Sequence, residues 1–153
     1  MITESEIYTG VVLARLALRL ERPFLIANLP VLGASYFRIG ERAGLHIKYC
    51  QNRLSPWTFT FTKEQKTKLV TLSDECANVV VALVCERAGV AALSLGDVWS
   101  LIKSPEENPN QASISVSRRP RQQYSVKGSL GTLERKVADN ELENWVAGSL
   151  GRV

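Results

Sequence analysis

The stretch VVVALVC, residues 79–85, is an uninterrupted apolar run of strand length. Such a run is typical of a strand inside a sheet that is covered on both faces. Before it, Thr62 and Gln65 have capping-box spacing, and apolar residues on one face predict a helix between this box and the run. After it, the turn Glu86–Gly89 leads into the apolar segment Val90–Leu95. We therefore expect residues 79–85 to be the central strand of an α/β sheet.

Another helix is predicted near the start of the chain. Thr3 and Glu6 have capping-box spacing and Pro23 ends the pattern, so the helix should run from Thr3 to about Leu20. An apolar stripe follows its 3- and 4-residue spacing, and we expect this stripe to face the core. The stripe consists of Ile7, Val11, Ala14 and Leu18, widened by Val12, Leu13 and Leu16. The opposing face carries Arg15, Arg19 and Arg22.

Four short strands are predicted between the two helices. Their ranges are Phe24–Leu29, Tyr36–Ile39, Leu45–Cys50 and Trp57–Phe61. The second and third should pair as a hairpin. In the third, apolar residues alternate with polar ones, so His46 and Lys48 share the face opposite the apolar side chains. In the fourth, aromatic residues alternate with threonines, a spacing that favours core packing over base stacking.

The composition changes in the last third of the chain. A short helix is predicted from about Asp97 to Lys103, and the following residues are rich in Pro, Asn and Gln. Residues 113–136 then contain six basic side chains against one acidic one, with strand patterns around a turn at Gly128–Gly131. The sequence therefore predicts an α/β core at 1–103, a linker at 104–112, and a basic β-hairpin extension with a C-terminal tail at 113–153.

Composition limits the chemistry and the compartment. The chain has 153 residues, a net charge of +4, three cysteines without CxxC spacing, and one histidine, which excludes a metal site built from two histidines. Its start lacks the basic region of a secretory signal, and no apolar stretch is long enough to span a bilayer. We therefore expect a cytoplasmic protein that does not bind membranes. The positive charge permits an anionic partner such as nucleic acid.

The predicted order of one helix, the first three of the four short strands, a second helix and the central strand resembles the αβββαβ core of the restriction-endonuclease-like, PD-(D/E)XK nuclease superfamily, over about residues 3–95. The resemblance implies a mixed β-sheet flanked by helices. It also implies that Mg²⁺ is held by an Asp of the second strand and by an acid of the third strand. In the family, a Lys follows the acid of the third strand two residues later. In this chain Lys48 matches the family's Lys, and His46 stands where the acid is expected. The second strand has no Asp, and Ser35 lies near its position.

With its acids replaced, this resemblance implies a catalytically degenerate nuclease-like domain that binds nucleic acid within a larger DNA-processing or defence assembly, without a cofactor or metal. Guanidinium and ammonium groups bind phosphates, so the basic residues are the predicted contacts. The predicted contact set is Lys48, Arg118, Arg119, Arg121, Lys127, Arg135 and Lys136. Within the Ser117–Gln123 segment, Pro120 keeps the chain extended, and the glutamines can reach base edges.

Two alternatives remain open. The first is an active metal-dependent nuclease, in which His46 and Lys48 are catalytic and Mg²⁺ is held by a rearranged acid set that includes Glu41 and Glu4 or Glu6. The second is a non-enzymatic interaction or structural subunit that binds a protein partner or another copy of itself. In that case the basic segment meets an acidic partner or only discourages pairing at the sheet edge, and His46 and Lys48 are ordinary strand residues.

Overall fold

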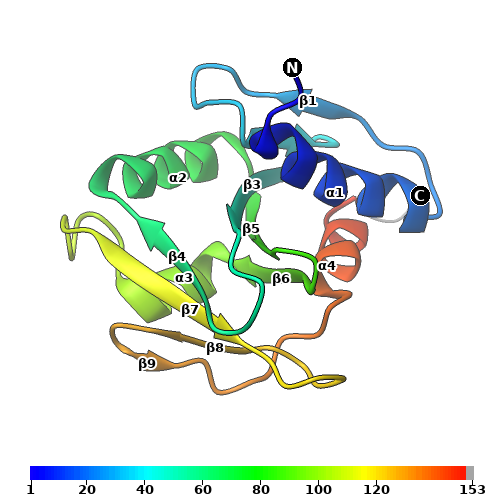
Figure 1. Cartoon of the computed structure of the whole chain (residues 1–153). Helices are drawn as coiled ribbons and strands as arrows, with labels where there is room; N and C mark the ends of the chain where they lie inside the picture. The colour runs from blue at the N-terminus through cyan, green and yellow to red at the C-terminus, as the bar shows by residue number, and fades with distance from the viewer. Residues whose placement is uncertain (151–153) are drawn as a thin grey trace.

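The computed structural model describes residues 1–150 and contains two sheets and four helices within that range (Figure 1). The main sheet has the strand order β1-β2-β3-β5-β6. Its strands are β1 (Ile26–Asn28), β2 (Tyr36–Ile39), β3 (Ala43–Cys50), β5 (Asn78–Cys85) and β6 (Gly89–Ser94). Strand β5 lies between β3, which is parallel to it, and β6, which is antiparallel. The predicted interior position of residues 79–85 is therefore confirmed, as is the antiparallel pairing of β2 with β3.

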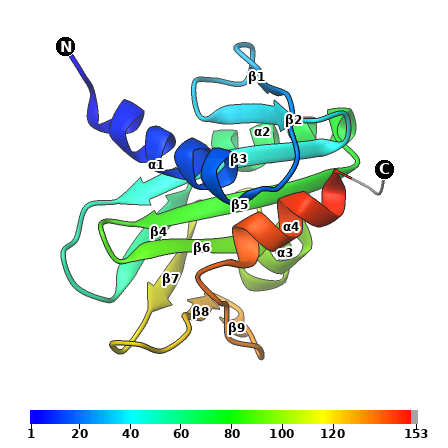
Figure 2. The ribbon, with the colours of Figure 1, turned by 90° about the vertical axis from the view of Figure 1, so that its right-hand side faces the viewer.

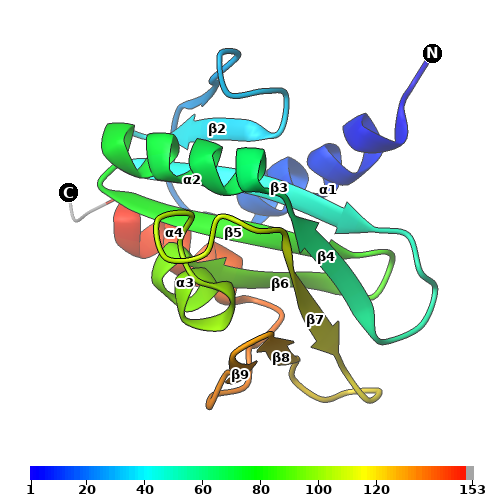
Figure 3. The ribbon, with the colours of Figure 1, turned by 90° about the vertical axis from the view of Figure 1, so that its left-hand side faces the viewer.

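Helices cover both faces of this sheet. They are α1 (Glu4–Arg19), α2 (Lys63–Glu75), α3 (Leu95–Ile102) and α4 (Glu141–Ser149). Figures 2 and 3 show α1 and α4 over one face, and α2 and α3 over the other. The run of β5 serves both layers, because Val80 and Ala82 pack with the α1–α4 core while Val81 and Leu83 pack with the α2–α3 core. The predicted mixed α/β class is confirmed.

The predicted buried stripe of α1 is correct for Val12 and Leu16 and wrong for Ile7 and Leu18. Val12 and Leu16 are its fully buried residues, whereas Ile7 and Leu18 of the predicted core stripe are 53% and 84% exposed. The arginines account for this rotation. Arg15 donates to the Asp139 carboxylate at 3.3 Å, and Arg19 donates to Glu143 at 3.0 Å. Because these acids lie just before and within α4, the helix turns its arginine side toward α4 and part of its apolar side toward solvent.

A second sheet, β4-β7-β8-β9, packs beyond α2 and α3. Its strands are β4 (Trp57–Phe61), β7 (Ala112–Ser117), β8 (Ser125–Gly128) and β9 (Gly131–Thr132). The aromatic residues of β4 are almost fully buried in the same core as α2 and α3, as their spacing predicts. The opposite face of β4 and β7 consists of threonine and serine side chains, including the hydrogen-bonded pair Thr60 and Ser113.

The β4–β7 ladder joins two segments that the sequence analysis assigns to different parts of the chain. Strand β4 comes from the predicted core at 1–103, and β7 comes from the predicted extension at 113–153. Both contribute to one hydrophobic cluster. The last three positions of the predicted extension, 151–153, lie outside the described residues. No helix within residues 1–150 is long and apolar enough to cross a membrane.

A buried lysine fastens the segment between α3 and β7. Lys66 lies on α2 and is fully buried. Its ammonium donates to the backbone carbonyl of Ile102 at 3.3 Å and to that of Asn108 at 2.9 Å. Ile102 ends α3 and Asn108 lies in the loop that follows, so neither carbonyl accepts a hydrogen bond within a helix, and each needs another donor. Lys66 therefore fixes the path of the predicted linker against α2.

Replacing Lys66 by Met should destabilise the protein. The apolar stem is kept, but two partly or fully buried carbonyls lose their donor, so the free energy of unfolding should fall by about 1–3 kcal/mol. Urea denaturation measures this change. The control is Lys63→Met on the exposed side of the same helix, which should change the free energy by less than about 0.5 kcal/mol. Equal effects of the two substitutions would contradict the anchoring role of Lys66.

Candidate functional site

The predicted strand histidine is buried. The imidazole of His46, on β3, is 3% exposed and stacks on the Tyr36 ring, with centroids 4.0 Å apart. Its Nδ1 lies 3.2 Å from the backbone oxygen of Ser35 and 3.3 Å from the hydroxyl of the same residue. A carbonyl oxygen only accepts, so Nδ1 carries the proton. Nε2 is buried and has no hydrogen-bond partner within residues 1–150.

The electrostatic environment keeps His46 neutral. Burial, and to a smaller extent the Lys48 ammonium, lower the pKa of the imidazole to about 3. An ordinary histidine titrates near pH 6.5. In the folded protein His46 is therefore uncharged throughout the physiological range, and it is not available as a general acid.

Lys48 lies two residues further along the same face of β3, as the alternation predicts. Its ammonium donates to Gln65 Oε1 at 3.0 Å and lies 4.8 Å from the centroid of the Phe61 ring. Gln65 also accepts from the Thr62 backbone N–H in the capping box of α2. The start of α2 and Lys48 therefore hold each other in place. Burial lowers the pKa of Lys48 to about 8.

A pocket of about 220 Å³ opens between these residues and α1. Polar groups in its lining come from three elements and the β1–β2 loop: Ser5, Thr9, Ser35, His46, Lys48 and Gln65. The resemblance implies acids at the positions of Ser35 and His46, and these two side chains do contact each other. They supply a hydroxyl and an imidazole in place of two carboxylates.

This donor set does not fit Mg²⁺. The cation prefers carboxylate and other oxygen ligands, and no carboxylate lines the pocket. Of the acids in the rearranged set, Glu41 lines a different pocket beside Arg22 and Arg42. Glu4 accepts a hydrogen bond from Gln51. Among residues 1–150 there is no group of three His, Cys, Asp or Glu side chains placed to hold a metal ion.

Besides Lys48, two cations of the predicted contact set make intramolecular contacts, and both lie in the C-terminal segment. The Arg118 guanidinium donates to the Ala88 carbonyl at 2.7 Å and lies 4.6 Å from the centroid of the Tyr124 ring. Its backbone N–H donates to the Ser55 hydroxyl at 3.2 Å. Arg135 forms ion pairs with Asp97 and Glu141. These two arginines therefore fasten loops and the start of α4 to the rest of the fold.

The remaining four basic residues of the C-terminal segment are free of such contacts. They are Arg119, Arg121, Lys127 and Lys136. All four are exposed, and none forms an ion pair with another residue of the described range. Arg119 and Lys136 line a pocket of about 460 Å³ together with Gln122 and Gln123. The structure thus brings cations from the β7–β8 loop and from the segment before α4 to one place.

The structure adds two arginines that the sequence analysis did not single out. Arg53, in the β3–β4 loop, and Arg87, in the β5–β6 turn, line a pocket of about 560 Å³. Both loops follow the carboxyl ends of parallel strands, which meet at one edge of the sheet, and Figure 2 shows both at the same end of the molecule. The contacts of Arg118 tie both loops to the β7–β8 loop. We name the resulting surface the basic edge. It consists of the pocket-lining cations Arg53, Arg87, Arg119 and Lys136, together with Arg121, an exposed residue of the β7–β8 loop.

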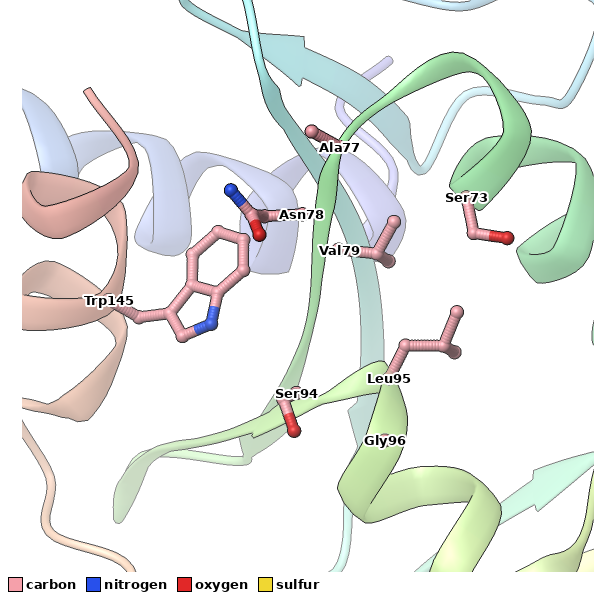
Figure 4. Close-up of a pocket in the computed structure, with 8 residues that line it drawn as sticks. All are labelled: Ser73, Ala77, Asn78, Val79, Ser94, Leu95, Gly96 and Trp145. Atoms are coloured by element: carbon pink, nitrogen blue, oxygen red, sulfur yellow. The ribbon is translucent and has the colours of Figure 1, made fainter. Parts of the chain in front are cut away.

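Another pocket, of about 250 Å³, lies at the opposite end of β5. Figure 4 shows Trp145 and Asn78 on one side of the start of β5, with Ser73 and Leu95 on the other. Its lining contains no titratable side chain. The charged and titratable groups of the candidate site therefore lie at the basic edge and in the pocket of His46 and Lys48. Comparisons with protein-family models, curated proteins and solved structures found no match.

The buried neutral histidine should make stability depend on pH. The pKa of His46 is about 3 in the folded protein and near 6.5 when unfolded, so between these values the unfolded chain binds more protons. Stability from this group is therefore complete above pH 6.5 and is lost as the pH falls toward 3. Its contribution should drop by about 2 kcal/mol between pH 7 and pH 5.

Urea denaturation at both pH values tests this in the wild type and in His46→Gln. His46 is the single histidine of the chain, so the other titrating groups are common to both proteins. The variant should lose less stability on acidification, by about the stated amount. An identical loss in the two proteins would contradict the depressed pKa.

Proposed function

We propose that this protein binds nucleic acid through the basic edge, on a nuclease-like domain whose metal-site residues are replaced. The observation that carries the proposal is that exposed arginines and lysines from separate loops lie together at this edge. Three of them, Arg119, Arg121 and Lys136, form no ion pair within the described residues. Arg87 of the basic edge pairs with Glu86, but these three unpaired cations create a positive potential that attracts a polyanion. Such a protein would act within a larger DNA-processing or defence assembly.

The topology of the main sheet supports the nuclease-like part of the proposal. Leaving β4 aside, the elements follow the order of one helix, three strands, one helix and an interior strand. This is the order that the restriction-endonuclease-like resemblance implies. The Ser35–His46 contact at the two expected acid positions supports the loss of the metal site.

The chemistry of the surface favours phosphate contacts over base recognition. The outward side chains of β4 and β7 are hydroxyl groups, and the aromatic residues of β4 point into the core. Stacking of bases on aromatic rings, which many single-strand binders use, therefore has no platform on this face. Gln122 and Gln123, exposed beside the cations, are the groups suited to base edges. Binding should be largely independent of sequence.

Removing three charges from the basic edge should weaken binding and its salt dependence together. An Arg119→Ala/Arg121→Ala/Lys136→Ala variant should make fewer phosphate contacts. Its binding should therefore release fewer counterions from the DNA. The log–log salt slope on duplex DNA should become shallower by about 2–3. Fluorescence anisotropy at several salt concentrations measures affinity and slope, and circular dichroism reports folding.

The matched control removes the same charge elsewhere. Arg42→Ala/Lys63→Ala/Lys68→Ala lowers the net charge equally but acts on the β2–β3 turn and α2. It should leave the slope nearly unchanged. If both triple variants behave alike, the contact is not at the basic edge. If the wild type binds neither DNA nor RNA at low salt, the interaction-subunit alternative replaces the proposal.

The protein should not cleave nucleic acid in the presence of Mg²⁺ or Mn²⁺, because the pocket of Lys48 lacks carboxylate ligands. The assay incubates labelled DNA and RNA with protein and metal and compares the products with a protein-free control. Metal-dependent cleavage that persists through further purification and disappears in Lys48→Ala would favour the active-nuclease alternative.

A further inference from the structure

The solvent-facing side of α1 is unusually apolar. Ile7, Val11 and Leu18 on this side are 53%, 38% and 84% exposed. The exposed residues between them are Gly10, Ala14 and Ala17. Arg15 lies at the margin and is turned toward Asp139. Because the opposite side buries Val12 and Leu16, the turn at residues 10–14 is apolar all round, a pattern typical of helices that are covered on every side.

Gly10 also indicates that this side of α1 is covered by a partner. Glycine inside a helix is less favourable than alanine, because its backbone loses more conformational freedom. A side chain at position 10 would meet no atom within 4 Å, so packing within the protein does not require glycine here. A glycine on an exposed helix face does allow another backbone to approach closely.

The charges at the two ends of α1 favour a second copy of the chain as the partner. The first turn carries Glu4 and Glu6, and the last turn carries Arg19, which forms an ion pair with Glu143 at 3.0 Å and remains 49% exposed. Two such helices packed antiparallel place each acidic end beside a basic end. The midpoint of α1 falls between residues 11 and 12, so Gly10 and Ala14 would lie at the crossing point.

We propose that two copies of the protein associate through α1, antiparallel and about a two-fold axis near Gly10 and Ala14. The surface is then self-complementary, as a two-fold dimer requires. Ile7 of one copy packs near Leu18 of the other. This association does not depend on nucleic-acid binding.

Substitution of Gly10 separates this proposal from a merely structural role. Gly10→Leu should raise the free energy of unfolding of the isolated protomer, because leucine favours the helical conformation and has open space at this position. The same change should raise the dimer dissociation constant at least tenfold, because it blocks close approach. Sedimentation equilibrium over a range of concentrations measures the dissociation constant, and circular dichroism confirms folding. The matched control is Gly148→Leu on α4, another exposed helical glycine with no atom within 4 Å, which should leave dimerisation unchanged.

Cross-linking tests the orientation. In an antiparallel pair, position 7 of one helix lies near position 18 of the other, whereas the two copies of position 7 are about 15 Å apart at 1.5 Å per residue. In a Cys50→Ser background, Ile7→Cys/Leu18→Cys should therefore form disulfide-linked dimers under mild oxidation. The single variant Ile7→Cys should not.

Three results would overturn the proposal. A wild type that remains monomeric at millimolar concentration would remove it, as would a dimer that Gly10→Leu does not weaken. Efficient cross-linking of Ile7→Cys alone would contradict the antiparallel arrangement.

Discussion

The parallel pairing of β3 with β5 is the contact on which the remaining structure depends. All eight residues of each strand take part, from Ala43 opposite Asn78 to Cys50 opposite Cys85. Parallel neighbours cannot be joined by a tight turn, so the chain between them must cross over the sheet. Here the crossover contains both β4 and α2. The same crossover covers one face of β3, starts the second sheet, and brings Gln65 over Lys48.

The central strand and the starts of α1 and α2 could be predicted because each depends on residues that are close together in the sequence. The apolar run of β5 indicates an interior strand, and the capping residues Thr3 and Thr62 indicate where α1 and α2 begin. Alternation along β3 also gives the shared face of His46 and Lys48. What covers that face is a tertiary matter, and the burial of His46 follows from packing that alternation does not encode. The orientation of α1 likewise depends on ion pairs between residues 124 positions apart.

The contacts of the candidate interface could likewise be predicted only in part from the sequence. A cluster of charges in sequence predicts where cations lie, but not which of them the fold itself uses. Arg118 and Arg135 find acceptors on distant elements, at Ala88 and at Asp97 and Glu141. Arg53 and Arg87 carried no sequence signal, because they stand alone in short loops. Their loops lie at one edge because the parallel strands β3 and β5 end there, and the contacts of Arg118 bring the C-terminal segment to the same edge.

The contacts of Arg118 also bear on the thermodynamics of association. One side chain and its own backbone N–H tie the β3–β4 loop, the β5–β6 turn and the ring of Tyr124 together. Loops fastened in this way are ordered before any ligand arrives, so less conformational entropy is lost when their neighbouring cations are engaged. Such a surface is preorganised. Under the proposed function, its affinity for a polyanion would reflect charge and desolvation, with little contribution from folding upon binding.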